Sequence, residues 1–140
     1  VISIENGITS VAMSAARRRH RALRSGRQYL RPTAFLNRGF GVHGPGELLA
    51  WSRILDDEEA LCVVNTHGTE RRHADVLIDA TLNAAAPRPG GGRSLQVIHT
   101  TDPTLAPLIG SSLPVGSRHG ITSVGLPDIG PSDVIILSNR

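Results

Sequence analysis

The sequence predicts an all-β domain, an antiparallel β-sandwich or barrel, preceded by one basic α-helix. Apolar runs of strand length recur through the last two thirds of the chain, separated by residues such as Gly, Pro and Asp. This is the pattern of antiparallel strands joined by turns. Only the first third contains a good helix candidate. The length of 140 residues is that of one domain with a sizeable core.

The helix lies at the start of the chain. Ser10 or Ser14 is suited to cap its N-terminus. Its last turns are rich in arginine, which suits the negative end of the helix dipole. Pro32 ends the region, because a proline forces the residue before it out of helical geometry. The chain therefore divides into a basic helical segment, residues 1–31, and a β-sandwich domain, residues 32–140.

Seven apolar runs predict the strands of the β domain. The runs at residues 48–55 and 60–65 surround an acidic turn and predict a hairpin. Residues 74–80 alternate between apolar and other positions, as in a half-buried strand. A stretch rich in Pro and Gly, residues 86–92, is incompatible with regular structure. The other strands are predicted at residues 95–100, 113–115, 121–126 and 133–138.

The positive charge of the chain is concentrated at one end. Residues 1–38 hold eight arginines and one acid, whereas residues 39–140 hold seven arginines and eleven acids. On charge alone, a basic arm ahead of a β domain is able to bind nucleic-acid phosphates. The residues of this possible basic surface are Arg17, Arg18, Arg19, Arg21, Arg24, Arg27 and Arg31.

Three motifs resemble functional signatures but favour ordinary structure. Residues 39–44 match G-x-G-x-x-G, yet Pro45 and a strand follow where a dinucleotide site needs a helix. The four acids at residues 56–59 are expected to form a solvated turn. Residues 67–73 are expected to form a surface loop, because their spacing differs from the metal-binding H-E-x-x-H. We therefore predict no cofactor, no metal ion and no catalytic residue.

Cysteine and aromatic content limit the remaining classes. Cys62, the single cysteine, rules out an internal disulfide, and its apolar neighbours predict a buried side chain in a reducing, cytoplasmic protein. No apolar run approaches the roughly 18 residues that a membrane-spanning helix requires. Trp51 is expected to pack in or near the core. The few other aromatic residues disfavour a free-standing carbohydrate-binding module.

Two stretches together carry a resemblance to a known family. The stretch RRRHRALRSGRQYLR, followed by an all-β domain, resembles the end of an α-amylase-family (family 13) glycoside hydrolase. Residues 47–65, ELLAWSRILDDEEALCVVN, look like a hairpin of that family's C-terminal domain, and residues 130–140 look like its final strand. The similarity covers about residues 14–140. The matching residues of the helix and turn are His20, Ala22, Leu23, Arg24, Gly26 and Tyr29.

The resemblance implies both a fold and a role. In the family, an antiparallel β-sandwich of Greek-key type, called domain C, follows the last helix of a catalytic (β/α)₈ barrel. The parent enzymes use retaining chemistry on α-glucosides, and their nucleophile Asp, acid/base Glu and third Asp lie in the barrel, upstream of the matching region. The chain is therefore expected to be an accessory, stabilising domain without activity of its own. Its expected partners are the barrel and, weakly, an α-glucan.

The resemblance also implies roles for individual residues. Ala22, Leu23 and Tyr29 are expected to contact the barrel, while the arginines form the outward face of the barrel helix. Residues 1–13 match nothing in the family. The alternative left open is a small nucleic-acid-binding β domain with an arginine-rich helical arm. Neither interpretation distinguishes hydrolysis from glycosyl transfer or identifies the substrate of the parent enzyme.

Overall fold

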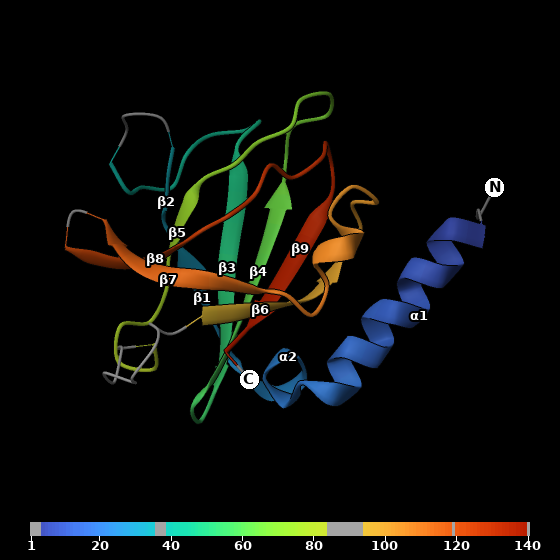
Figure 1. The fold of residues 1–140 in the computed structure, drawn as a ribbon, viewed down its shortest axis with the longest axis horizontal. Helices are drawn as coiled ribbons and strands as arrows, with labels where there is room; N and C mark the ends of the chain where they lie inside the picture. The colour runs from blue at the N-terminus through green and yellow to red at the C-terminus, as the bar shows by residue number, and fades with distance from the viewer. Residues whose placement is uncertain (1–3, 36–38, 84–93, 119, 140) are drawn as a thin grey trace.

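Antiparallel β-strands are the main regular structure of the protein (Figure 1). Every strand pair within the described residues is antiparallel, so the expected all-β fold is confirmed. The Pro/Gly-rich residues 86–92 lie outside this description. The structure, a computed structural model, describes residues 4–35, 39–83, 94–118 and 120–139, with the backbone alone at residues 4–11 and 118.

The expected single helix is replaced by two helices. α1 spans Ile4–Arg19 and α2 spans Arg21–Ser25. Because α1 begins at Ile4, Ser10 and Ser14 lie inside it, and the prediction that one of them caps the helix is wrong. In Figure 1, α1 lies beside the sheet as a separate rod, and α2 lies near the tip of the hairpin formed by β3 (Leu48–Leu55) and β4 (Glu58–Asn65).

The two helices are separated at His20, whose backbone is extended, with φ −109° and ψ 101°. Glu58 stabilises this break, because its carboxylate accepts a hydrogen bond of 3.1 Å from the N–H of Ala22. In a continuous helix that N–H would bond to a helical carbonyl. The imidazole of His20 is buried 3.9 Å from the same carboxylate. Burial lowers the pKa of His20 and outweighs the opposing attraction of Glu58, so the ring is neutral at pH 7.

Sheet pairing begins at Arg27, ahead of the boundary expected at residue 32. β3 to β9 overlap the seven predicted runs, while β1 and β2 were not predicted. The strands are β1 (Arg27–Arg31), β2 (Thr33–Ala34), β3 (Leu48–Leu55), β4 (Glu58–Asn65), β5 (Asp75–Leu77), β6 (Ser94–Thr100), β7 (Ser112–Arg118), β8 (Ile121–Gly125) and β9 (Val134–Ser138).

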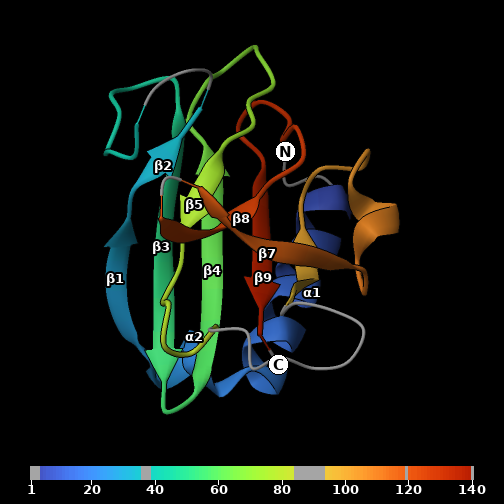
Figure 2. The same cartoon turned by 60° about the vertical axis from the view of Figure 1, so that its left-hand side comes forward.

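One continuous sheet has the strand order β1-β3-β4-β9-β6-β7-β8-β5-β2. β7 joins two parts of this sheet, because residues 112–114 pair with β6 and residues 115–118 pair with β8. Figure 2 shows β1, β3, β4 and β9 side by side, with β7 and β8 crossing in front of them. β1 and β2, at opposite ends of the order, are joined through Pro32 alone. The sheet therefore curves back on itself and is nearly barrel-shaped.

Aliphatic side chains fill the space between the two parts of the sheet. Leu61 and Val63 point inward from β4, and Ile135 and Leu137 point inward from the neighbouring β9. All four are fully buried. Removal of this apolar surface from water is the main favourable contribution to folding. The remaining core residues are Leu48, Ala50, Ala74, Val76, Ile78, Leu95, Val97, Leu105, Val124, Leu126 and Ile129.

One acid of the predicted solvated turn is buried. Asp56 and Asp57 form the exposed turn, but Glu59 lies in β4 with an exposed fraction of 0%. The expectation of four solvated acids is therefore wrong for Glu59, and also for Glu58, which lies in β4 with its side chain 12% exposed. Two residues along the strand from Leu61, Glu59 has the same inward direction as the core side chains.

Glu59 is held by donors from three parts of the chain. One carboxylate oxygen accepts hydrogen bonds from the Arg31 guanidinium, at 2.8 Å, and from the Ser52 hydroxyl. The other accepts from the side-chain amide of Asn83, at 2.7 Å, and from the N–H of Asp79, at 3.0 Å. A buried carboxylate needs such partners, because an unpaired one is strongly destabilising. This buried cluster ties β1, β3 and β4 to the turn after β5.

The opposite end of the sheet is held by two buried polar residues. The Asn65 side-chain amide donates to three backbone carbonyls of the surrounding loops, at 2.9 to 3.2 Å. Asp102 accepts hydrogen bonds from the N–H groups of Thr104 and Gly130 and from the guanidinium of Arg71. Burial alone raises the pKa of Asp102, but these three donors outweigh it, so the pKa lies below its ordinary value.

Candidate functional site

The outer face of the sheet, which points away from the core, carries a row of apolar side chains. Strand register aligns Leu30, Trp51, Cys62, Ile136 and His99 across β1, β3, β4, β9 and β6. Leu30, at the β1 end, is 55% exposed, whereas Cys62 and Ile136 are each 5% exposed. The row therefore runs from open surface at the edge strand to covered surface near β6.

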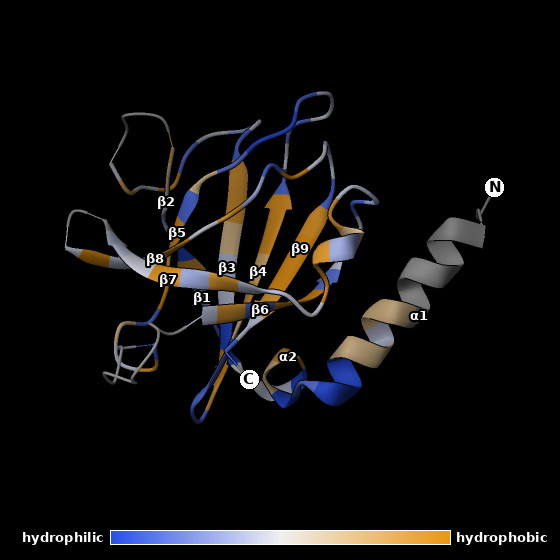
Figure 3. Cartoon of the chain, viewed as in Figure 1, coloured by the Kyte–Doolittle hydropathy of each residue, from blue (hydrophilic) through white to orange (hydrophobic). Residues whose placement is uncertain are grey.

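A second row lies beside the first. Leu49, Val64 and Val134 are aligned on β3, β4 and β9, and Leu49 is 38% exposed. Antiparallel sheets commonly pack one face on the core and present a polar face to water. Here both faces of β3, β4 and β9 are apolar, and Figure 3 shows these strands among the most hydrophobic parts of the chain. An apolar outer face of this kind is typical of a surface that packs against something else.

Helix α1 covers part of this outer face. In Figure 2 it lies behind β9 and β6, on the side away from β7 and β8. Between the helices and the sheet is an open groove with a volume of about 310 Å³. We call it the outer-face groove; its lining residues are Met13, Arg17, Leu23, Trp51, Arg53, Cys62, Val134 and Ile136.

Burial affects two polar groups of the outer-face groove, the Cys62 thiol and the Arg53 guanidinium. Burial raises the pKa of the Cys62 thiol to about 11, against a weaker opposing effect of Arg53. Cys62 is therefore an unreactive, apolar part of the wall. The Nε of Arg53 is buried and has no hydrogen-bond partner within the described residues. A buried donor without an acceptor is unfavourable, so the Arg53 guanidinium lacks a complement at this atom.

His99 lies at the covered end of the first row. It is 4% exposed, and its Nε2 has no hydrogen-bond partner within the described part of the chain. α1 contacts β6, the strand that carries it. Burial lowers the pKa of His99, so the folded protein favours the neutral imidazole.

We expect the His99→Leu substitution to weaken the pH dependence of stability. The unfolded chain takes up a proton near the ordinary pKa of 6.5, whereas the folded chain does so only at lower pH. The free energy of unfolding therefore falls as the pH drops below about 6.5. Urea unfolding at about pH 5 and about pH 7.5 should show a smaller loss on acidification in the variant than in the parent. An equal loss in the two proteins would contradict this role for His99.

The residues expected to contact a barrel occupy three different environments. Ala22 is fully buried against its own chain. Leu23 is half-buried in the outer-face groove beside Trp51. Tyr29 is 42% exposed, and its ring lies under the guanidinium of Arg31, 5.6 Å from the ring centroid. Tyr29 therefore lies on the opposite face of β1 from Leu30, and only Leu23 of the three belongs to the groove.

The arginines of the possible basic surface also lie in different environments. Arg31 lies in the buried cluster around Glu59, with its side chain only 12% exposed. Arg19 and Arg21 share a cavity of about 220 Å³ with the acidic tip of the β3–β4 hairpin, Asp56 to Glu58. Nearby acids lower the positive potential that a phosphate backbone would meet. The exposed arginines are Arg17, Arg18, Arg19, Arg21, Arg24 and Arg27.

Sequence reasoning missed the outer-face groove, although a signal for it was present. In β3, Leu48 and Ala50 face the core while Leu49 and Trp51 face outward. Apolar residues at both alternating positions of a strand indicate that both of its faces are covered. The expectation that Trp51 packs near the core overlooked this second face.

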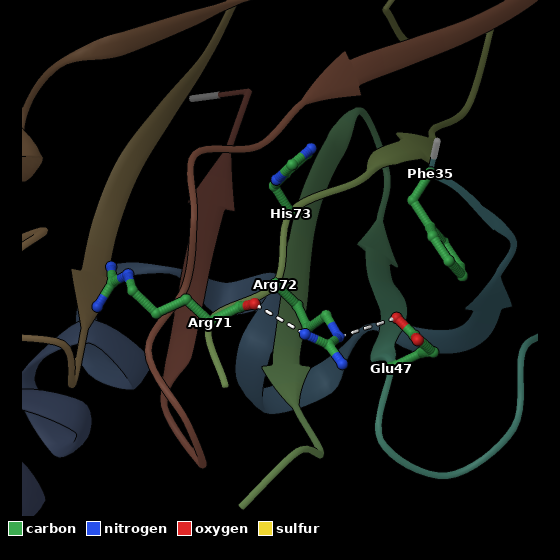
Figure 4. Close-up of a pocket in the computed structure, with 5 residues that line it drawn as sticks. All are labelled: Phe35, Glu47, Arg71, Arg72 and His73. Carbon is green, nitrogen blue, oxygen red and sulfur yellow. Dashed lines mark hydrogen bonds and ion pairs between the residues drawn. The ribbon is translucent and has the colours of Figure 1, made fainter. Parts of the chain in front are cut away.

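A second pocket, with a volume of about 310 Å³, lies at the end of the sheet near Asn65 (Figure 4). Phe35 forms one wall, and its ring meets the His43 ring edge-on with centroids 4.7 Å apart. Opposite it, the Arg72 guanidinium pairs with Glu47 at 3.4 Å and with Glu70 at 2.7 Å. The pocket thus combines an aromatic ring with both hydrogen-bond donors and acceptors.

The remaining walls of this pocket come from the loop at residues 66–74. Arg71 contributes its backbone carbonyl, which accepts a hydrogen bond from Arg72, while its own side chain points away in Figure 4. His73 is bonded to Asp128 at 2.7 Å. His67 accepts hydrogen bonds from two backbone N–H groups of the loop through Nδ1. The hydrogen bonds of His67 therefore stabilise the conformation of the loop, which was expected to be a surface loop.

The described residues contain no cluster of three or more His, Cys, Asp or Glu side chains suited to a metal ion. None of the described helices has the length and apolar character needed to cross a bilayer. Comparisons with protein-family models, curated proteins and solved structures found no match to this chain.

Proposed function

We propose that the chain is the accessory, stabilising C-terminal domain of an α-amylase-like glycoside hydrolase or glucanotransferase, not catalytic by itself. The apolar outer face of β3, β4 and β9 is the observation that carries this proposal. The helices cover only part of this face, and Leu30 and Leu49 stay exposed, so a second body is suited to cover the rest. The catalytic (β/α)₈ barrel that precedes such domains would supply it.

The join between the helices and the sheet supports the same proposal. A Cβ atom on Gly26 would lie 2.5 Å from the carbonyl oxygen of Ala22 and 2.9 Å from the backbone nitrogen of Ile54. Only glycine lets α2 approach β3 this closely. This gives a physical reason for the Ala-Leu-Arg-x-Gly turn on which the resemblance rests: it fixes the last helix against the first hairpin.

The finer fold assignment is part of the proposal. β9, which the resemblance matches to the final strand of domain C, pairs with β4 beside the β3–β4 hairpin. β7 passes from one part of the sheet to the other. Both features are compatible with a Greek-key β-sandwich of the domain C type.

A weak α-glucan contact belongs to the same proposal and fits the pocket of Figure 4 best. The Phe35 ring offers an apolar surface for the C–H face of a sugar ring. The paired Glu47 and Arg72 offer an acceptor and a donor for hydroxyl groups. Because carboxylates already neutralise Arg72, a neutral polyol suits the pocket better than an anion does.

The gene upstream of the Val1 codon tests the proposal directly. We expect the same reading frame to encode a (β/α)₈ barrel with the nucleophile Asp, the acid/base Glu and the third Asp. We also expect the purified chain of 140 residues to release no reducing sugar from α-glucans. An unrelated upstream sequence, or hydrolysis by the purified chain, would overturn the proposal. Nucleic-acid binding that weakens steeply with salt would support the arginine-arm alternative instead.

A further inference from the structure

The outer-face groove has an apolar floor and a positive rim. Leu23, Trp51 and Ile136 supply apolar surface, whereas Arg17 and Arg53 supply the charges. No carboxylate belongs to the described residues that line it. The acids nearest in sequence, Asp56 to Glu58, line a different cavity with Arg19 and Arg21.

The Nε of Arg53 makes the rim more than a solvated charge. This atom is buried, and none of the described residues accepts a hydrogen bond from it. A carboxylate is the strongest partner for a guanidinium, because the hydrogen bond is charge-assisted. The described lining of the groove therefore carries the positive charges of Arg17 and Arg53 and no acid to balance them.

We propose that the outer-face groove receives an acidic amphipathic helix of the partner domain, which places an apolar side chain beside Trp51 and a carboxylate on Arg53. This inference rests on the proposed function, since it specifies the chemistry of the surface that covers the domain. Helices dock in grooves through apolar side chains at successive turns, and charged flanks select the partner. A basic or uncharged helix would leave Arg53 without its complement.

Trp51 provides the measurement, because it is the only tryptophan in the chain and it lines the groove. The probe is a synthetic helical peptide with a leucine face and glutamate flanks. Its comparison is a peptide with the same leucine face and lysine flanks. Titration of the full chain, followed by Trp51 fluorescence, should give roughly tenfold tighter binding of the glutamate peptide, weakening with salt.

Charge reversal tests the role of the rim. Arg53→Glu should reverse the preference, so that the lysine peptide binds more tightly. Arg17→Glu, on the exposed side of α1, should act in the same direction and does not disturb the sheet. Arg27→Glu is the matched control, because Arg27 is exposed on β1 and outside the groove lining. It should leave the preference for the glutamate peptide intact.

Several results would overturn the inference. They are equal binding of the two peptides, no binding of either, an unchanged preference in both groove variants, and self-association that covers Trp51 with a second copy. These outcomes are separable from failure of the proposed function. If no barrel is encoded upstream, the proposed function fails, but the preference for the glutamate peptide can still be measured. If a barrel is encoded upstream and the chain shows no preference for the glutamate peptide, this inference alone fails.

Discussion

Replacing Glu59 with glutamine is expected to lower the free energy of unfolding by about 3–5 kcal/mol. The total stability of a domain of this kind is about 5–15 kcal/mol, so this is a large fraction. The substitution keeps the size of the side chain but leaves the Arg31 guanidinium without a counter-charge, with its side chain 12% exposed. The new amide also puts a second donor group where Asn83 already donates. Urea unfolding followed by Trp51 fluorescence measures the loss.

Two further variants separate the ion pair from its surroundings. The double variant Arg31→Met, Glu59→Gln should lose less stability than the sum of the two single losses, because no buried charge is left unpaired. Arg27→Gln removes an exposed arginine from the same strand and should change stability by no more than about 0.5 kcal/mol. A loss for Glu59→Gln as small as that of Arg27→Gln would show that the Arg31–Glu59 pair contributes little.

The strands that sequence predicted best are those with clear apolar alternation or continuous apolar runs. β3 appears where the pattern placed it, β4 begins two residues earlier than predicted, at Glu58, and β9 follows the run at residues 133–138. Their inward side chains bury enough apolar surface to fix the register. β5 is shorter than predicted, Asp75–Leu77, although Ala74, Val76 and Ile78 all face the core as the alternation indicated.

The elements that sequence missed depend on contacts between distant residues. Strand β1, RQYLR, has few apolar residues. It becomes a strand because each of its five residues pairs with a residue of β3, from Ala50 to Ile54. The helix break at His20 depends on Glu58, which is far along the chain. Propensity does not contain such information, since tertiary context decides these segments.

The candidate site divides in the same way. The resemblance predicted Leu23 as a contact to the barrel, which stays a prediction; in the structure Leu23 lines the outer-face groove. Arg31 was grouped with the other arginines because sequence shows charge but not direction. Its inward orientation follows from strand alternation with Leu30, once β1 is recognised as a strand. The burial of Glu59 was missed for the same reason, since four consecutive acids are typical of a solvated turn.

Truncation at two positions is expected to give opposite results. A chain beginning at Gly26 loses α1 and α2 but keeps β1 and the Arg31–Glu59 pair. It should fold, less stably by at least about 1.5–3 kcal/mol, because the hydrogen bond from Ala22 to the Glu58 carboxylate is gone and the outer face loses the cover of the two helices. A chain beginning at Pro32 also loses β1, with its five register pairs to β3. It should show no cooperative unfolding transition, since the loss approaches the whole stability of about 5–15 kcal/mol.

The physical reason for the difference is that the appendage ends at Gly26 and the sheet begins at Arg27. The double variant Arg31→Met, Glu59→Gln of the full chain is the control, because it removes the ion pair and keeps the strand. If the chain from Pro32 unfolded cooperatively at the same urea concentration as the chain from Gly26, β1 would be dispensable. The basic segment of residues 1–31 would then be one detachable unit, as its charge suggested. If it does not fold, that segment contains both the end of a helical connection and the first strand of the β domain.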